Sequence, residues 1–532
     1  MERFRKILTV LAALAVTSAA ICAETAERIY ISTDKDVYIA GERIWCSVFN
    51  IDGASSGRLS GLSATAYIEL QSADGTVKTA KAALTGGRGA AVINIPAELA
   101  TGNYRLIGYT ALNKQEKGYD YHANAKIISV FNALSSDRVE GGVEVVEEGA
   151  YAKTDVASSS SIRMEDGEIV YKYNGGEEAS VSISVCIEDG IASPSAFNIA
   201  GFASRNANAS ASYADAWIPE YEGEIIHCNV IGQNDGKAAF IAAPAELPNL
   251  CAATIRNGKA DFFTQNIYGD TDLVCQIENG AEGGRMELVS PFVEAKGGTI
   301  PALKICKTLA PAIIARSSVL KEDPKAGVDT LLDRMPDTAN YLMGDKPVQY
   351  ELDNYTRFPV MGEVITEFVS ELRARKDENG MQDIQVKLAD KYGRFYFSTG
   401  ASLMMIDGVP ILSHQNVYDY DPLLVKTINI YPYSFFVGDR GFTGAANFVT
   451  YRKSLQNVKF DDDVRIVPFT GTSYPCSYSG SANTLYWHPL VDIAAGSGIR
   501  CSIPAGSGAV RIKVEGLTKS GKAIFETAVI RK

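Results

Sequence analysis

Short apolar runs alternate with polar or glycine-containing breaks along most of the chain. Ile29 and Ile31 fall on one face of an extended segment, and Tyr30 and Ser32 fall on the other. This period of two is that of a β-strand. Runs this short, separated by frequent Asp-Gly and other turn signals, predict β-sandwiches rather than an α/β domain.

One segment carries a helical period instead. Across Pro359–Lys376 the apolar residues recur every three or four positions and predict one buried stripe. That stripe consists of Met361, Ile365, Phe368 and Leu372. Glu363, Glu367 and Glu371 repeat on another face, which we interpret as solvated rather than catalytic. Shorter helices are predicted over Leu309–Arg316 and Val328–Met335, within a stretch containing several prolines.

A chain of 532 residues is too long for a single core, so we expect several domains. The predicted fold class is mainly β, with tandem Ig-like or fibronectin-like β-sandwiches and one small α+β domain. After a leader (1–23), the expected segments are sandwiches at 24–130, 131–215 and 216–300, a connector at 301–344, the α+β domain at 345–455 and an Ig-like β domain at 456–532.

The first hundred residues after the leader resemble a known domain type. Thr33-Asp34-Lys35, then Tyr38 and Gly41-Glu42, with the later run Thr101–Leu106, resemble the second macroglobulin-type domain of the alpha-macroglobulin superfamily. The resemblance implies a fibronectin-like sandwich. It does not imply the family's thioester chemistry, because no cysteine here has the required Glu-Gln neighbourhood.

A second resemblance covers residues 345–453. A strand over Leu403–Pro410, then Asp421-Pro422, then Gly438–Ala446 before a last strand resemble the plug domain of TonB-dependent outer-membrane receptors. Fewer than a hundred residues follow, whereas the barrel of that family needs about twenty-two strands. The resemblance therefore implies a plug-like module without its barrel. This combination of modules resembles exported proteins of Bacteroidetes-type bacteria.

The N-terminus predicts export. Arg3, Arg5 and Lys6 precede an apolar core at 7–16, and small residues follow it, so cleavage is expected after Ala23. Cys22 raises an alternative in which that cysteine is lipidated. Ile21 stands where a lipidation signal favours a small residue, so the sequence favours simple cleavage. We expect a periplasmic or outer-membrane-associated protein with no membrane-spanning segment.

Net charge and cysteine spacing limit the ligands that the chain is expected to bind. The net charge of −12, without a basic stripe interleaved with aromatic residues, argues against a nucleic-acid partner. No Cys-x-x-Cys pair and no histidine at metal-ligand spacing occur, so we predict no metal site and no cofactor. Cys476 and Cys501, in one predicted domain, form the best candidate disulfide. The middle five cysteines read at least as well as buried apolar residues: Cys186, Cys228, Cys251, Cys275 and Cys306.

No catalytic or binding residue is assigned. The four histidines, His122, His227, His414 and His488, are scattered over different predicted modules, and we expect His227 and His488 to be packed. The favoured function is a non-enzymatic envelope protein that binds or braces another envelope protein, such as an outer-membrane barrel or its complex. One alternative is a hydrolase using Asp407 and Asp421, although Asp407-Gly408 also reads as a turn. Another is a macroglobulin-like protease-binding protein.

Overall fold

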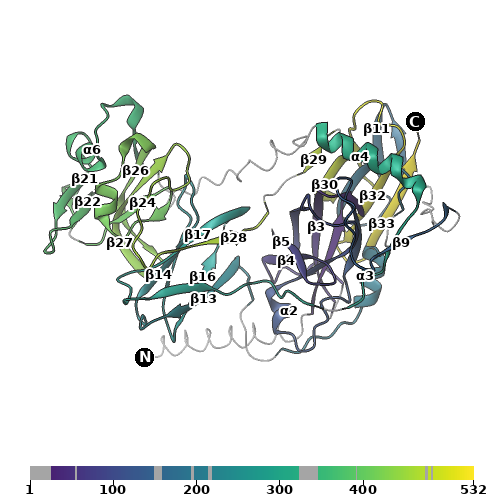
Figure 1. Ribbon diagram of the computed structural model, residues 1–532, viewed down its shortest axis with the longest axis horizontal. Coiled ribbons are helices and arrows are strands. Elements are labelled where there is room, and N and C mark those ends of the chain that lie inside the picture. Colours follow the sequence, from purple (N-terminus) through teal and green to yellow (C-terminus); the bar gives the residue numbers. More distant parts are fainter. Residues whose placement is uncertain are drawn as a thin grey trace. The chain divides into compact units, whose positions relative to one another are not determined.

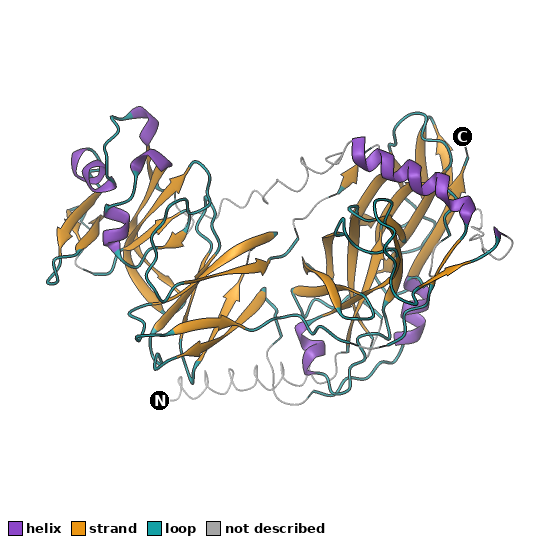
Figure 2. Cartoon of the chain, viewed as in Figure 1, coloured by secondary structure: helices purple, strands orange, loops and turns teal. Residues whose placement is uncertain are grey.

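The computed structural model describes residues 26–531, except 54–56, 149–158, 193–196, 214–218, 266, 297, 323–345, 391, 399, 474–476 and 481–482. The predicted leader with Cys22 and the predicted helix Val328–Met335 lie outside the described residues. The chain forms two compact units. The first comprises Met1–Gly223, Phe292–Pro336 and Thr472–Lys532, and the second comprises Glu224–Pro291 and Asp337–Gly471. Strands dominate both (Figure 1 and Figure 2), which confirms the predicted mainly β fold.

The first unit begins with a two-sheet sandwich. Its three-stranded sheet has the order β1 (Glu27–Thr33), β3 (Arg43–Asp52), β6 (Arg88–Asn94). Its five-stranded sheet has the order β2 (Val37–Ile39), β8 (Lys126–Phe131), β7 (Gly102–Tyr109), β4 (Thr65–Gln71), β5 (Thr76–Ala83). Ile29 and Ile31 point into the core between these sheets, as their alternation predicts.

The second sandwich of this unit is built from two distant parts of the sequence. β12 (Ala179–Ile187) lies between β30 (Thr484–Ile493) and β32 (Val510–Thr518) in one sheet. That sheet has β29 (Tyr478–Ser479) and β33 (Ala523–Ile530) as its edges. The facing sheet has the order β10 (Ile162–Glu165), β11 (Glu168–Lys172), β31 (Gly498–Cys501).

This pairing corrects the expected separation of 131–215 from 456–532. β12 is a central strand, so hydrogen-bonding groups along both of its edges need partners. The nearby hairpin β10–β11 lies in the facing sheet, and the C-terminal strands supply both partners. Val181, Ile183 and Val185 do share the predicted core face.

The second unit contains a third sandwich, and it too borrows a late strand. One sheet has the order β16 (Lys259–Thr264), β13 (Glu224–Ile231), β18 (Arg285–Leu288). The other has the order β15 (Leu250–Thr254), β14 (Ala238–Ala242), β17 (Asp270–Ile277), β28 (Arg465–Thr470). β28 falls within 456–532, so that expected last domain contributes strands to two different sandwiches.

The α+β part of the second unit spans residues 348–450. Its main sheet has the order β20 (Val348–Glu351), β26 (Val425–Val437), β27 (Arg440–Thr450), β24 (Leu403–Ile406), β25 (Val409–Pro410). A smaller sheet has the order β21 (Leu372–Lys376), β22 (Gln382–Ala389), β23 (Phe395–Phe397). Two short helices, α6 (Met361–Glu367) and α7 (His414–Tyr418), complete it.

The predicted helix over Pro359–Lys376 is wrong in its second half. The helix ends at Glu367, and Leu372–Lys376 forms β21, paired with β22. Phe368 and Leu372 still pack on the core that Met361 and Ile365 enter. The apolar spacing is therefore met by a helix followed by a strand, which a periodicity of 3.6 cannot distinguish from a longer helix.

The connecting segments are mostly local. α2 (Ala111–Gln115) and α3 (Ile199–Asn206) lie in the first unit, and β9 (Val143–Val145) pairs in parallel with β19 (Leu303–Ile305). α4 (Ala310–Glu322) contains most of the predicted helix Leu309–Arg316. Across the described residues, every helix is too short or too polar to cross a lipid bilayer.

The shared core of the second sandwich is testable by a double-mutant cycle. Ile183 and Val514 are fully buried and directly opposite one another on β12 and β32. We expect Ile183→Ala and Val514→Ala to be non-additive in unfolding free energy by about 0.5–3 kcal/mol, as for contacting residues. Denaturant unfolding followed by the fluorescence of Trp45 and Trp487, both in the first unit, measures this.

Pairing Ile183→Ala with Ile226→Ala, in the core of the third sandwich, is the control and should be additive. Additivity of the Ile183 and Val514 variants would contradict the shared sheet.

Candidate functional site

The outer face of the sheet β1-β3-β6 is covered by the sheet that contains β12. Tyr30 and Phe49 pack with Leu517, and Trp45 packs with Trp487 at a ring-centroid distance of 5.3 Å. Between these two apolar contacts lie polar and charged side chains. We call this layer between the two sandwiches the seam. The seam stacks the four sheets of these two sandwiches with three interfaces between them.

The turn that follows β1 anchors one end of the seam. Asp34, which is 2% exposed, accepts hydrogen bonds from Tyr38 Oη (2.7 Å) and the Trp45 amide (3.1 Å), both in its own sandwich. Its other oxygen accepts from Thr484 Oγ1 (2.5 Å), in the second sandwich, and from Lys35 Nζ (3.1 Å). The Asp34 carboxylate therefore joins the two sandwiches through direct hydrogen bonds.

A second carboxylate lies deeper in the seam. Glu515 of β32 is 1% exposed and accepts hydrogen bonds from Tyr30 Oη (2.6 Å) and Ser32 Oγ on β1. Lys513 Nζ lies 3.4 Å from the Glu515 carboxylate and donates to the Thr33 carbonyl at 2.6 Å. Glu515 and Lys513 of the second sandwich thus each find hydrogen-bond partners on β1 of the first.

The ionisation of these groups follows from their neighbours. Burial disfavours the charged form of Glu515, but Lys513, Lys126 and the hydrogen bonds from Ser32 and Tyr30 together hold its pKa below the ordinary value. Burial also opposes the charge of Lys513, and Glu515 with nearby acids raises its pKa nonetheless. The seam therefore contains an ionised pair whose charges depend on each other.

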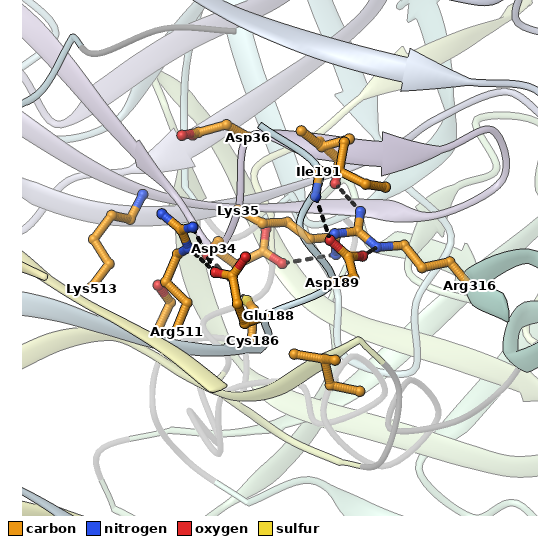
Figure 3. Close-up of a pocket in the computed structure, with 13 residues that line it drawn as sticks. Asp34, Lys35, Asp36, Cys186, Glu188, Asp189, Ile191, Arg316, Arg511 and Lys513 are labelled. Atoms are coloured by element: carbon orange, nitrogen blue, oxygen red, sulfur yellow. Dashed lines mark hydrogen bonds and ion pairs between the residues drawn. The ribbon is translucent and has the colours of Figure 1, made fainter. Parts of the chain in front are cut away.

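A cavity of about 80 Å³ opens beside the Asp34 turn (Figure 3). It is lined by the turn 34–37, the end of β12 and the residues after it, Arg316 of α4, and β32. Its charges are matched within the chain. Arg511 pairs with Glu188 at 2.6 Å, and Arg316 pairs with Asp189 and donates to the Val37 carbonyl at 2.7 Å.

Because the charged residues that line the cavity pair with one another, the cavity joins structural elements and does not form an ion-binding site. A ligand with charge would have to displace an internal ion pair to bind there. Cys186 lies in the wall, and burial and the charge of Asp34 raise the pKa of its thiol to about 12, so it stays protonated and is a poor nucleophile at neutral pH. In the described part of the chain, no group of three or more His, Cys, Asp or Glu side chains gathers in a way that could hold a metal ion.

The sequence motif Thr33-Asp34-Lys35 therefore falls at a structural junction. Sequence reasoning missed its partners on β32, because Arg511, Lys513 and Glu515 alternate with core residues and read as a solvent-facing row. The one available signal was the sign change from Lys513 to Glu515, two positions apart on one face.

The candidate carboxylates Asp407 and Asp421 serve separate local roles. Asp407 is fully buried, has a φ of +49°, and accepts from the Thr450 amide and hydroxyl (both 2.7 Å) and the Leu455 amide (3.0 Å). Asp421 caps the short helix Pro422–Leu424 by accepting from the Leu423 amide at 2.8 Å. The predicted turn at Asp407-Gly408 is present.

The histidines do not converge on either carboxylate. His227 was expected to be packed but is exposed on β13, with Nδ1 2.7 Å from an Asp261 oxygen. His414 accepts from the Ile384 amide at 2.9 Å and lies 3.2 Å from the Ser402 carbonyl oxygen. Burial lowers the pKa of His122 and of His488, and both therefore favour the neutral ring.

The cysteine prediction is also corrected. Cys501 is a buried free thiol whose pKa burial raises to about 12, and Cys476 lies outside the described residues. The buried free cysteines Cys186, Cys228, Cys275 and Cys306 agree with the reading of these residues as small apolar groups, and Cys251 is only partly buried.

Comparison with known proteins gives distant matches to solved structures. No protein-family model and no curated protein matches the chain. Native Escherichia coli alpha-2-macroglobulin matches 96% of this chain and 23% of its own, with 10% identity and a TM-score of 0.17. The trypsin-activated E. coli protein (9%, TM-score 0.24) and the methylamine-reacted Salmonella protein (7%, TM-score 0.25) each match 96% of this chain. The chain spans 41% and 40% of those two structures. TM-scores this low do not identify a shared function.

The buried carboxylate of the seam predicts acid sensitivity. Because the folded-state pKa of Glu515 is lowered, its contribution to stability is complete above the unfolded pKa of about 4.3 and is lost as pH falls toward the folded value. We expect Glu515→Gln to lower the unfolding free energy of the first unit by about 3 kcal/mol at pH 7, since Lys513 loses its partner. The variant should also show a shallower decline below about pH 4.

Denaturant titrations at several pH values measure both effects, and Glu98→Gln, at an exposed site of the same unit, is the matched control. An unchanged pH dependence in Glu515→Gln would mean that Glu515 is not ionised in the folded protein.

Substitutions of Asp407 and Asp421 are expected to have unequal effects on stability. Asp407→Ala leaves three buried donors without an acceptor and should destabilise the second unit by about 3 kcal/mol. Asp421→Ala removes a helix cap and should cost about 1 kcal/mol. Thermal unfolding measures the difference, and equal effects would contradict these roles.

Proposed function

We propose that the chain is a non-enzymatic, exported envelope protein that binds or braces another envelope protein, such as an outer-membrane barrel or its complex. The observation that carries the proposal is the seam. Buried ion pairs and aromatic packing hold two sandwiches in a fixed arrangement, which suits a protein whose role is to present surfaces.

The surroundings of the titratable groups support a binding role over a hydrolytic one. A carboxylate hydrolase needs two acids that face one substrate, with pKa values pushed apart. Asp407 and Asp421 instead accept hydrogen bonds from different backbone segments that each of them organises. The charges of the cavity beside Asp34 are likewise committed to ion pairs.

The location and the plug-like character of residues 345–453 are part of the proposal. The basic, apolar and small-residue order of the N-terminus supports export. The strand motifs at Leu403–Pro410 and Gly438–Ala446 support a plug-like module that contacts a barrel. A Bacteroidetes-type source fits the same combination of modules.

A crosslinking experiment tests this function. The full chain with a C-terminal affinity tag, crosslinked in intact cells of its source organism and purified from detergent-solubilised envelopes, should yield a discrete adduct with one or a few envelope proteins. A tagged chain lacking residues 1–23 stays inside the cell and is the control. Adducts no more abundant than those of the control would overturn the proposal.

A protease-binding role is the second candidate, favoured by the Thr33-Asp34-Lys35 motif and its place at the sandwich junction. A protease-protection assay separates the two. Stable capture of an active protease by the purified chain, with loss of its activity on protein substrates, would favour this second role.

A further inference from the structure

The small sheet β21-β22-β23 carries cations and aromatic rings on its outer face. Opposite this face, Ile384, Val386 and Leu388 enter the core. On the outer face the Arg373 guanidinium lies 4.2 Å from the Phe397 ring centroid, and Lys387 Nζ lies 5.2 Å from that of Phe395. Arg375 is two positions beyond Arg373 on β21 and so shares its side of the sheet.

We call Arg373, Arg375, Lys387, Phe395 and Phe397 the basic aromatic face. Sequence reading found no basic stripe with interleaved aromatic residues because these residues lie on three strands. The register brings them together: Lys387 is opposite Phe397, and Arg373 is opposite Gln385. Figure 1 shows β21 and β22 beside α6, within the second unit.

Exposed rings extend this face to the edge of the sheet. β23 is the edge strand, and Phe395 is 71% exposed. Tyr392, before β23, is 72% exposed, whereas Tyr396 is opposite Leu388 and lies on the other side of the sheet. Two large exposed rings, Tyr392 and Phe395, beside an edge strand are a hazard for a protein that presents them to water alone. Their exposure indicates a partner that covers them.

The cations of this face are only partly neutralised. Asp390 pairs with Arg394 at 2.8 Å, at the turn that leads into β23. Asp383 is engaged by Gln385 (2.9 Å) and His414 (3.2 Å). Arg373 Nε has no hydrogen-bond partner among the described residues. Arg373 donates to the neutral Gln385 at 2.7 Å, and Arg375 stands opposite Asp383, whose oxygens are engaged by Gln385 and His414.

We propose that the basic aromatic face attaches the second unit to an anionic lipid surface. Arg375 and Lys387 would meet lipid phosphates, and Tyr392 and Phe395 would lie at the level of the headgroups, where aromatic side chains are favourable. An anionic lipid surface would therefore contact both the exposed cations and the exposed rings.

Other polyanions use only part of this arrangement. Single-stranded nucleic acid binds by stacking bases on the faces of aromatic rings. Here cations lie over the rings of Phe395 and Phe397, so these faces are already engaged. An acidic peptide would pair with the cations but would leave Tyr392 and Phe395 in water. A lipid surface is therefore the partner whose chemistry matches the whole face.

This inference deepens the proposed envelope function by naming a second, non-protein attachment, and it is tested without any protein partner. The chain from residue 24 is sedimented with vesicles of phosphatidylcholine alone and with phosphatidylglycerol added at a ratio of about 7 to 3. We expect binding to the anionic vesicles only, weakened by salt.

Two variants test the two components. The pair Arg375→Gln and Lys387→Gln should lower the partition coefficient about tenfold or more, because two cations near the surface are lost. The pair Tyr392→Ser and Phe395→Ser should lower it by a similar factor through lost ring insertion. Melting curves establish that both variants are folded.

Matched controls come from the same unit. Lys259→Gln with Lys426→Gln removes two exposed cations elsewhere, and Phe263→Ser removes a ring that is 60% exposed on β16. Neither should change binding.

Equal binding by all variants, or equal binding to neutral vesicles, would overturn the proposal. Tighter, variant-sensitive binding to a single-stranded oligonucleotide or to polyglutamate would overturn it in favour of that polyanion. Vesicle binding without a crosslinked envelope protein would reject the protein partner and support the lipid surface. A crosslinked envelope protein without vesicle binding would reject the lipid surface and support the protein partner.

Discussion

The ionised pair of Lys513 and Glu515 is the interaction on which the first unit depends. A carboxylate that is 1% exposed is tolerated only when an opposite charge and hydrogen bonds replace its water. Here those replacements come from both sandwiches, with Tyr30 and Ser32 donating from the first. Neither sandwich alone offers Glu515 a satisfied environment, so the two are most stable together.

Such a seam contributes more to specificity than to net stability. Well-packed apolar residues in place of a buried ion pair are often as stabilising. What the charges add is a single permitted register, because a shifted pairing would leave Asp34 or Glu515 without donors. The aromatic contact between Trp45 and Trp487 supplies apolar burial beside them. The result is two sandwiches joined in one defined orientation.

The sequence predicted strand faces well and strand partners poorly. The alternation of Ile29 with Tyr30, and of Val181 with the serines around it, correctly separates the two faces of each strand. The pattern does not predict that the polar face of β1 is also buried. Serine, tyrosine and paired charged residues are compatible both with exposure to water and with a hydrogen-bonded interior. Burial of Lys513 and Glu515 follows from pairing across more than 450 residues, from Ser32 to Glu515, which no local period reports.

The same limit explains two further outcomes, at the helix after Pro359 and at Asp407. Phe368 and Leu372 keep their apolar spacing whether the chain continues as a helix or turns into β21, because both side chains reach one core. Asp407 was a catalytic candidate because it is an acid at the end of a predicted strand. Its donors come from Thr450 and Leu455, more than 40 residues later, so its buried structural role cannot be seen in the local sequence. The basic aromatic face likewise exists only through the register of three strands.

The central position of β12 has a consequence for biogenesis. β12 ends at Ile187, whereas β30 begins at Thr484, nearly 300 residues later. At about 5–20 residues per second, a ribosome needs roughly 15–60 s to supply the missing neighbours. During that interval both edges of an apolar strand lack their native partners. A nascent chain in this state exposes both edges of β12 to chaperones until β30 and β32 have been synthesised.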